Sequence, residues 1–141
     1  MTAPIAPELR RLVAERAGRR CEYCSFPQAV ALHRHEPDHI IPLQHGGVTD
    51  AANLALACLR CNRYKGPNVG SIDPLTGELV PLFHPRRQVW EQHFQLVGAE
   101  IKPLTPEGRV TVRLLRLNDP DRLTERQRLI ETGLFWTPSA G

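Results

Sequence analysis

The chain has 141 residues, of which 41% are hydrophobic, and a formal net charge of +3. This length suits one small domain, and the charge is compatible with a polyanionic partner without establishing one. No apolar run approaches the roughly 20 residues of a membrane helix, and the N-terminus, MTAPIAPELRR, lacks the features of a secretory signal. We therefore expect a cytoplasmic chain with no membrane partner, whose thiols stay reduced.

The predicted elements of the first half are short. Residues 7–17 have apolar side chains at helical spacing and are expected to form a helix. Residues 29–35 alternate apolar and polar side chains and are expected to form a strand that ends at a proline. The QHGG tetrapeptide predicts a turn. Thr49 or Asp50 is suited to cap a helical turn, and residues 59–65 are expected to form a helix that stops at a Gly-Pro pair.

The second half predicts further short strands and helices. A strand is expected at residues 78–83, followed by a helix that Pro85 opens. Two short strands are expected on either side of Gly98. The segment from residue 105 is favoured as a helix, although RVTVR alternates like a strand. Residues 120–132 are expected to form the last helix.

All four cysteines lie in two identical C-x-x-C pairs, CEYC and CLRC. Two such pairs are what a tetrahedral thiolate zinc site requires, because each loop presents two sulfurs and the metal joins the loops. Disulfides are disfavoured by the lack of a secretory signal, and a redox C-x-x-C would need only one pair. The expected zinc ligands are Cys21, Cys24, Cys58 and Cys61.

The expected role of this zinc is structural. Four thiolates leave no open coordination position for a water molecule. A site of this kind contributes about 10–16 kcal/mol of apparent folding free energy. The zinc is therefore expected to hold the centre of the chain together and to take no part in catalysis.

Between and after the cysteine pairs, the sequence reads D-H-I-x-P-x-x-x-G-G and then N-L-x-x-x-C-x-x-C-N-x-x-K-G. With the first C-x-x-C, this pattern resembles the HNH endonuclease family, whose core is a two-stranded hairpin followed by a helix around one metal ion. Downstream, LFHPRRQVWEQHF and LTPEGRV look like the tails of small bacterial members. The resemblance implies an α+β fold with a ββα-metal (His-Me finger) core, flanked by N- and C-terminal helices. It also implies a single domain over residues 1–141, with the core at 21–66 and an extension at 67–141.

The resemblance implies the chemistry of three residues. Hydrolysis of a phosphodiester needs an activated water and a hard divalent cation as Lewis acid. Asp38 would be a ligand of that cation, and His39 would be the general base, a role that suits a largely neutral imidazole. Asn53 would orient His39 by hydrogen bonding. The alternatives are a surface Asp38, a core His39 and an Asn53 that only caps a turn.

At the last position of the family pattern the chain has Asn62, whereas the final letter of the family name stands for histidine. Asp38 and Asn62 would then offer only oxygen ligands, which suit Mg²⁺ or Mn²⁺ better than Zn²⁺. Lys65 follows one helical turn later on the same face and would contact a phosphate or stabilise transition-state charge. The alternatives are an Asn62 that caps the cysteine loop and a solvated Lys65.

The sequence therefore predicts a metal-dependent HNH endonuclease that acts on DNA, with nicking of duplex as its minimal activity. It is expected to act as a monomer or homodimer without a small-molecule cofactor. Two alternatives remain: a zinc-clamped nucleic-acid-binding module without nuclease activity, and an interaction domain with a structural zinc. No segment resembles a sequence-reading module, so low or short-context sequence preference is expected.

Overall fold

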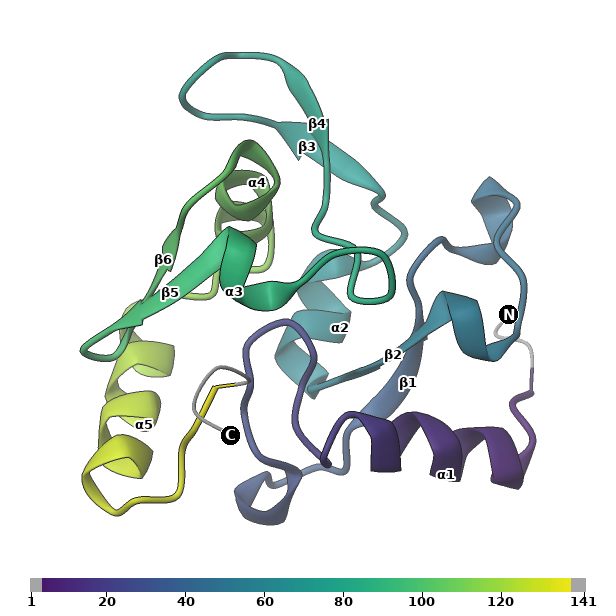
Figure 1. Ribbon diagram of the computed structural model, residues 1–141, viewed down its shortest axis with the longest axis horizontal. Helices are drawn as coiled ribbons and strands as arrows, with labels where there is room; N and C mark the ends of the chain where they lie inside the picture. The colour runs from purple at the N-terminus through teal and green to yellow at the C-terminus, as the bar shows by residue number, and fades with distance from the viewer. Residues whose placement is uncertain (1–3, 138–141) are drawn as a thin grey trace.

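The computed structural model describes residues 4–137. A hairpin and a helix form its centre: β1 (Glu36–His39) pairs antiparallel with β2 (Leu54–Ala57), and α2 (Leu59–Lys65) follows at once. Helix α1 (Pro7–Arg16) packs against both strands (Figure 1). This is the hairpin-and-helix order expected from the resemblance, and the predicted helix over Leu59–Lys65 is confirmed.

The connection between β1 and β2 is long and folds tightly back on itself. It contains two 3₁₀ turns, η2 (Leu43–His45) and η3 (Ala51–Asn53). The predicted glycine turn is confirmed: Gly46 ends η2 with a φ of 89°. A Cβ on Gly47 would lie 1.7 Å from the Ile41 carbonyl oxygen, so only glycine fits there.

The C-terminal half adds two further hairpins and three helices, and the expected α+β fold is confirmed. The β3–β4 hairpin projects away from the rest of the chain, and α5 lies beside the β5–β6 hairpin (Figure 1). The elements of this half are β3 (Gly70–Ile72), β4 (Leu79–Pro81), α3 (Trp90–His93), β5 (Phe94–Val97), β6 (Glu100–Pro103), α4 (Pro106–Leu114) and α5 (Pro120–Glu131); before β1, the chain also forms the 3₁₀ turn η1 (Gln28–Val30).

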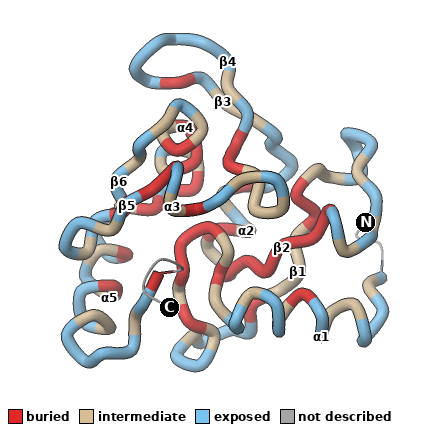
Figure 2. Tube along the Cα trace, viewed as in Figure 1, coloured by how far each residue is buried: buried red, intermediate tan, exposed pale blue. Residues whose placement is uncertain are grey.

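The buried core joins the two halves around the cysteines. Buried residues gather where the first cysteine loop, β2 and the α3–β5 segment meet (Figure 2). One cluster contains all four cysteines together with Trp90, Phe94 and Leu117. The indole nitrogen of Trp90 donates to the Tyr23 carbonyl oxygen at 3.0 Å. The C-terminal half therefore packs directly on the cysteine loops.

The strand predicted over residues 29–35 is wrong. That segment holds only the 3₁₀ turn η1, and the strand begins at Glu36 instead. The predicted strand ended before Pro37, but a proline is tolerated where a strand has a hydrogen-bonded partner on one side only. β1 is such a strand, because β2 is its single partner in the sheet.

The helix predicted to open at Pro85 is also wrong, since α3 begins at Trp90. The His84 ring explains the difference. Its Nδ1 accepts hydrogen bonds from the backbone nitrogens of Arg86 and Arg87, at 3.2 and 3.3 Å. The Gln88 side chain accepts from the His84 backbone nitrogen at 2.8 Å, so side chains close a turn here before the helix starts.

Candidate functional site

The four cysteines form one compact, buried cluster. Their sulfur atoms all lie within 4.8 Å of one another, and the Cys24 and Cys58 sulfurs are 3.7 Å apart. Tetrahedral zinc with Zn–S bonds of about 2.3 Å separates its sulfurs by about 3.8 Å. Cys58 is the N-cap of α2 and Cys61 lies in its first turn, so one ligand pair sits at the start of the helix. The cluster fits a structural zinc ion.

A buried arginine from the last helix lies against this cluster. Nη2 of Arg122 is 3.2 Å from the Cys61 sulfur and 3.9 Å from the Cys58 sulfur, and Nη1 donates to the Leu115 carbonyl. Burial alone would lower the pKa of Arg122, but the neighbouring sulfurs raise it above its ordinary value. Four thiolates on a divalent ion carry excess negative charge, so Arg122 compensates that charge and attaches α5 to the cluster.

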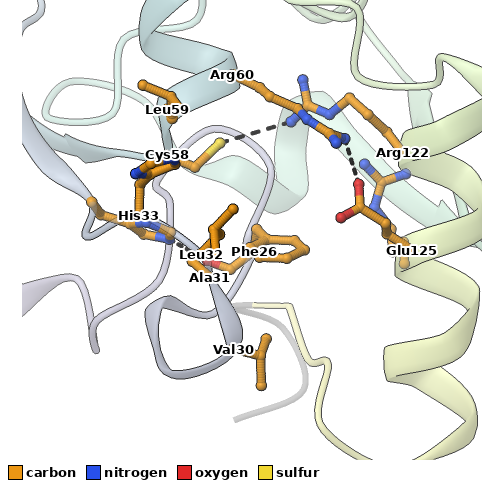
Figure 3. A pocket seen from close by; sticks show the side chains of 12 residues that line it. Phe26, Val30, Ala31, Leu32, His33, Cys58, Leu59, Arg60, Arg122 and Glu125 are labelled. Carbon is orange, nitrogen blue, oxygen red and sulfur yellow. Dashed lines mark hydrogen bonds and ion pairs between the residues drawn. The ribbon is translucent and has the colours of Figure 1, made fainter.

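A cavity of about 340 Å³ opens beside the cysteine cluster, between it and α5. Figure 3 shows Arg122 directed at the Cys58 sulfur, and Arg60 paired with Glu125 across the cavity. Arg60 and Arg122 in this cavity are therefore already paired, and Arg126 donates to the carbonyl oxygens of Ala99 and Leu117. Asp38 and His39 do not line it, so the cavity is separate from the candidate catalytic residues.

Asp38 and Lys65 form a buried ion pair between β1 and α2. Lys65 Nζ lies 3.1 Å from Asp38 Oδ2 and also donates to the His39 carbonyl oxygen at 3.0 Å. The Tyr23 hydroxyl donates to the same Asp38 oxygen at 3.5 Å. Burial raises the pKa of Asp38 although Lys65 acts to lower it. The structure thus places Lys65 on the carboxylate expected to hold the metal, with its side chain only 1% exposed.

Asn62 lies one helical turn before Lys65 on α2. Residues three apart on a helix share a face, so the Asn62 amide lies on the side of α2 from which Lys65 reaches Asp38. Asn62 is half-buried, and its side chain has no hydrogen-bond partner among residues 4–137. The amide oxygen of Asn62 and the second carboxylate oxygen of Asp38 thus have no hydrogen-bond partner among the described residues.

His39 is buried at the end of β1, and one nitrogen of its ring is held. Nε2 lies 2.8 Å from the Thr49 hydroxyl oxygen. Nδ1 has no hydrogen-bond partner in the described part of the chain, and it is not among the buried polar atoms left unpartnered. Nδ1 is therefore the ring nitrogen that no side chain or backbone group of the described residues contacts through a hydrogen bond.

Asn53 holds the loop that follows His39 and makes no side-chain hydrogen bond to His39 itself. Its Oδ1 accepts from the Ile41 nitrogen at 2.9 Å. Its Nδ2 donates to the carbonyl oxygens of Ile41 and Val48, both at 2.9 Å. These three bonds satisfy the amide and close the loop from 41 to 48, while Asp50 caps η3 as expected.

Replacement of Lys65 by methionine tests the ion pair. Lys65→Met keeps the length of the side chain but leaves the Asp38 carboxylate buried without its cation, which should cost about 3–5 kcal/mol near neutral pH. Added Mg²⁺ should restore part of this loss, because a bound cation supplies the missing charge. Chemical denaturation with and without Mg²⁺ measures both effects. The control is Lys102→Met, since Lys102 is exposed; equal stabilities of the two variants would contradict the assignment.

Three residues of this region were not predicted from the sequence as parts of the site: Tyr23, Thr49 and Arg122. Tyr23 lies inside the first C-x-x-C pair, and an aromatic residue at this position was a usable signal of a buried side chain next to the cysteines. Thr49 was noticed only as a helix cap. Arg122 lies far from the cysteines in the chain, and no local pattern separates it from the other arginines of its helix.

Comparison with known proteins agrees with this geometry. Residues 21–68 match the family model of the HNH endonucleases, which confirms the resemblance over that segment. Septu protein PtuB of Bacillus thuringiensis is 27% identical over 128 residues, covering 89% of this chain and 47% of that protein. The chain thus spans about half the length of the curated relative it matches. No solved structure shows significant similarity, and no helix within residues 4–137 is long and apolar enough to cross a membrane.

Proposed function

We propose that this chain, whose residues 21–68 match the HNH endonucleases, hydrolyses phosphodiester bonds in DNA with the help of a divalent cation. One observation carries the proposal. Asp38 and His39 are consecutive residues at the end of β1, and Lys65 of α2 contacts the carboxylate of Asp38 and the backbone carbonyl of His39. A module that only binds nucleic acid needs no such combination of metal ligand and base.

Asp38 and Asn62 would hold a Mg²⁺ or Mn²⁺ ion through oxygen atoms. When bound, this ion supplies Lewis-acid stabilisation of charge on the phosphate and on the leaving oxygen. His39 Nδ1 takes the proton from the attacking water, because it is the ring nitrogen without a protein partner. Lys65 neutralises Asp38 in the absence of the metal and fixes the backbone of His39 through its carbonyl.

A second cavity, of about 260 Å³, is lined in part by Lys65, Ile40, Ile41, His84 and Arg87. It therefore lies next to Lys65 and to the segment that follows His39, although Asp38 and His39 themselves do not line it. The net charge of +3 agrees with a polyanionic substrate. One site per chain cuts one strand per event, so nicking of duplex DNA is the activity to expect of a single subunit.

Conversion of supercoiled plasmid to nicked circle tests the proposal. The zinc-loaded protein should nick with Mg²⁺ or Mn²⁺, nick poorly with added Zn²⁺ and be inactive with EDTA, because two oxygen ligands favour hard cations. Activity should return when Mg²⁺ is restored. Activity that persists in EDTA would contradict a metal-dependent mechanism. Metal-independent DNA binding without nicking would favour a zinc-clamped binding module.

A further inference from the structure

We infer that Thr49 is the positioning residue of the His39 imidazole: its hydroxyl oxygen accepts the Nε2 hydrogen and so keeps Nδ1 free to take the proton of water. The inference rests on the proposed nuclease function for its catalytic meaning. The contact itself is direct, with 2.8 Å between the two atoms. No other hydrogen bond to this ring exists among the described residues.

The chemistry of imidazole determines which atom must be the donor. A neutral ring carries one hydrogen, so the nitrogen that accepts a proton must be the other one. If water is to lose its proton to Nδ1, the ring hydrogen must already be on Nε2. The Thr49 hydroxyl can accept that hydrogen both before the transfer and afterwards, when the ring is an imidazolium and both nitrogens are donors. The bond therefore need not break during the reaction.

The loop architecture explains how Thr49 reaches the ring. Asn53 binds the Val48 carbonyl, directly before Thr49, as well as both backbone groups of Ile41. Gly47 lies so close to Ile41 that it has no room for a side chain. Asp50, directly after Thr49, caps η3 through the Ala52 nitrogen. Residues on both sides of Thr49 are thus held in place, so any effect of Asn53 on His39 would pass through this loop and the Thr49 hydroxyl.

Two substitutions separate the hydroxyl from the shape of the side chain. Thr49→Val removes the hydroxyl and keeps the branched shape, whereas Thr49→Ser keeps the hydroxyl. In single-turnover plasmid nicking at saturating protein, Thr49→Val should be about 10- to 100-fold slower, as for other groups that orient an active residue. Thr49→Ser should retain most of the rate, and plasmid affinity should stay unchanged in both. Thr124→Val, at an exposed helical threonine, is the control.

A spectroscopic measurement makes the test independent of cleavage. Nitrogen chemical shifts of the neutral His39 ring should show one tautomer with the hydrogen on Nε2. In Thr49→Val the shifts should move towards a mixture of both tautomers. A variant with unchanged shifts and an unchanged nicking rate would overturn the inference. If the parent protein shows the single tautomer but never nicks DNA, the proposed function fails while the role of Thr49 in holding the ring stands.

Discussion

Removal of zinc from the cysteine cluster should unfold the centre of the molecule. A structural zinc contributes about 10–16 kcal/mol of apparent folding free energy, which equals or exceeds the whole stability of a typical domain, about 5–15 kcal/mol. The cluster lies inside the main buried core, together with Trp90, Phe94 and Leu117. Chelation or Cys61→Ser should therefore abolish the cooperative thermal transition and the near-ultraviolet circular dichroism of the packed aromatic residues.

The loss should extend to the C-terminal helix. Arg122 is 5% exposed, and its guanidinium contacts the Cys58 and Cys61 sulfurs. Without a folded cluster this buried cation loses its partners, which is costly. Amide hydrogen exchange should accelerate in α5 and β2 together when the metal is removed, and zinc should reverse both changes. Faster exchange confined to the first cysteine loop would contradict this coupling.

The parts of the site that the sequence predicted are those specified by short, local patterns. Two C-x-x-C pairs form a four-sulfur cluster when the fold brings the two loops together. In this structure the four sulfur atoms do lie together. The glycine pair and Asn53 specify the turn of the hairpin, since only particular residues fit there. The end of the helix over Leu59–Lys65 was predicted from the Gly-Pro pair that follows it, and the structure adds Cys58 as its N-cap.

The parts that the sequence did not predict depend on contacts between distant residues. From the helix alone, Lys65 is predicted to face a phosphate or solvent. The fold instead buries its ammonium group against Asp38. Arg122 looks like one more arginine of a solvated helix face until the core places it on the cysteine sulfurs. The strand that begins at Glu36 was not predicted because it contains a proline. A proline is tolerated in an edge strand, and the sequence alone does not show that this strand lies at the edge of a sheet.

The role of Asn53 shows why a family pattern alone does not explain a mechanism. The resemblance implies that this residue orients the base, and that role stays a prediction. The side-chain amide bonds the loop backbone at Ile41 and Val48, and the group in contact with the imidazole is the Thr49 hydroxyl. A sequence pattern identifies the residue type that a family uses at a position, whereas the hydrogen bonds of the structure show which groups that residue contacts.

Substitution of His39 should reduce plasmid nicking by about 100- to 10,000-fold, the usual contribution of a general base. His39→Ala removes the ring and leaves the Thr49 hydroxyl without its partner. His39→Gln keeps an amide near that hydroxyl but removes the basic nitrogen, so it should be as inactive as alanine and better folded. The initial rate of nicking in Mg²⁺ measures the effect, and circular dichroism with zinc content shows that each variant is folded.

The comparison with His33→Ala makes this result specific. His33 is an exposed histidine outside the hairpin, so its loss should leave the nicking rate within about 2-fold, as for most surface substitutions. The defect of His39→Gln should narrow as the pH rises, because hydroxide from the solvent replaces the missing base. Full activity in both His39 variants would mean that another group, or another protein in the preparation, deprotonates the water. Inactivity of His39→Gln beside normal activity of His33→Ala, with DNA affinity unchanged, would assign the base to His39, because glutamine supplies hydrogen-bonding groups but no basic nitrogen.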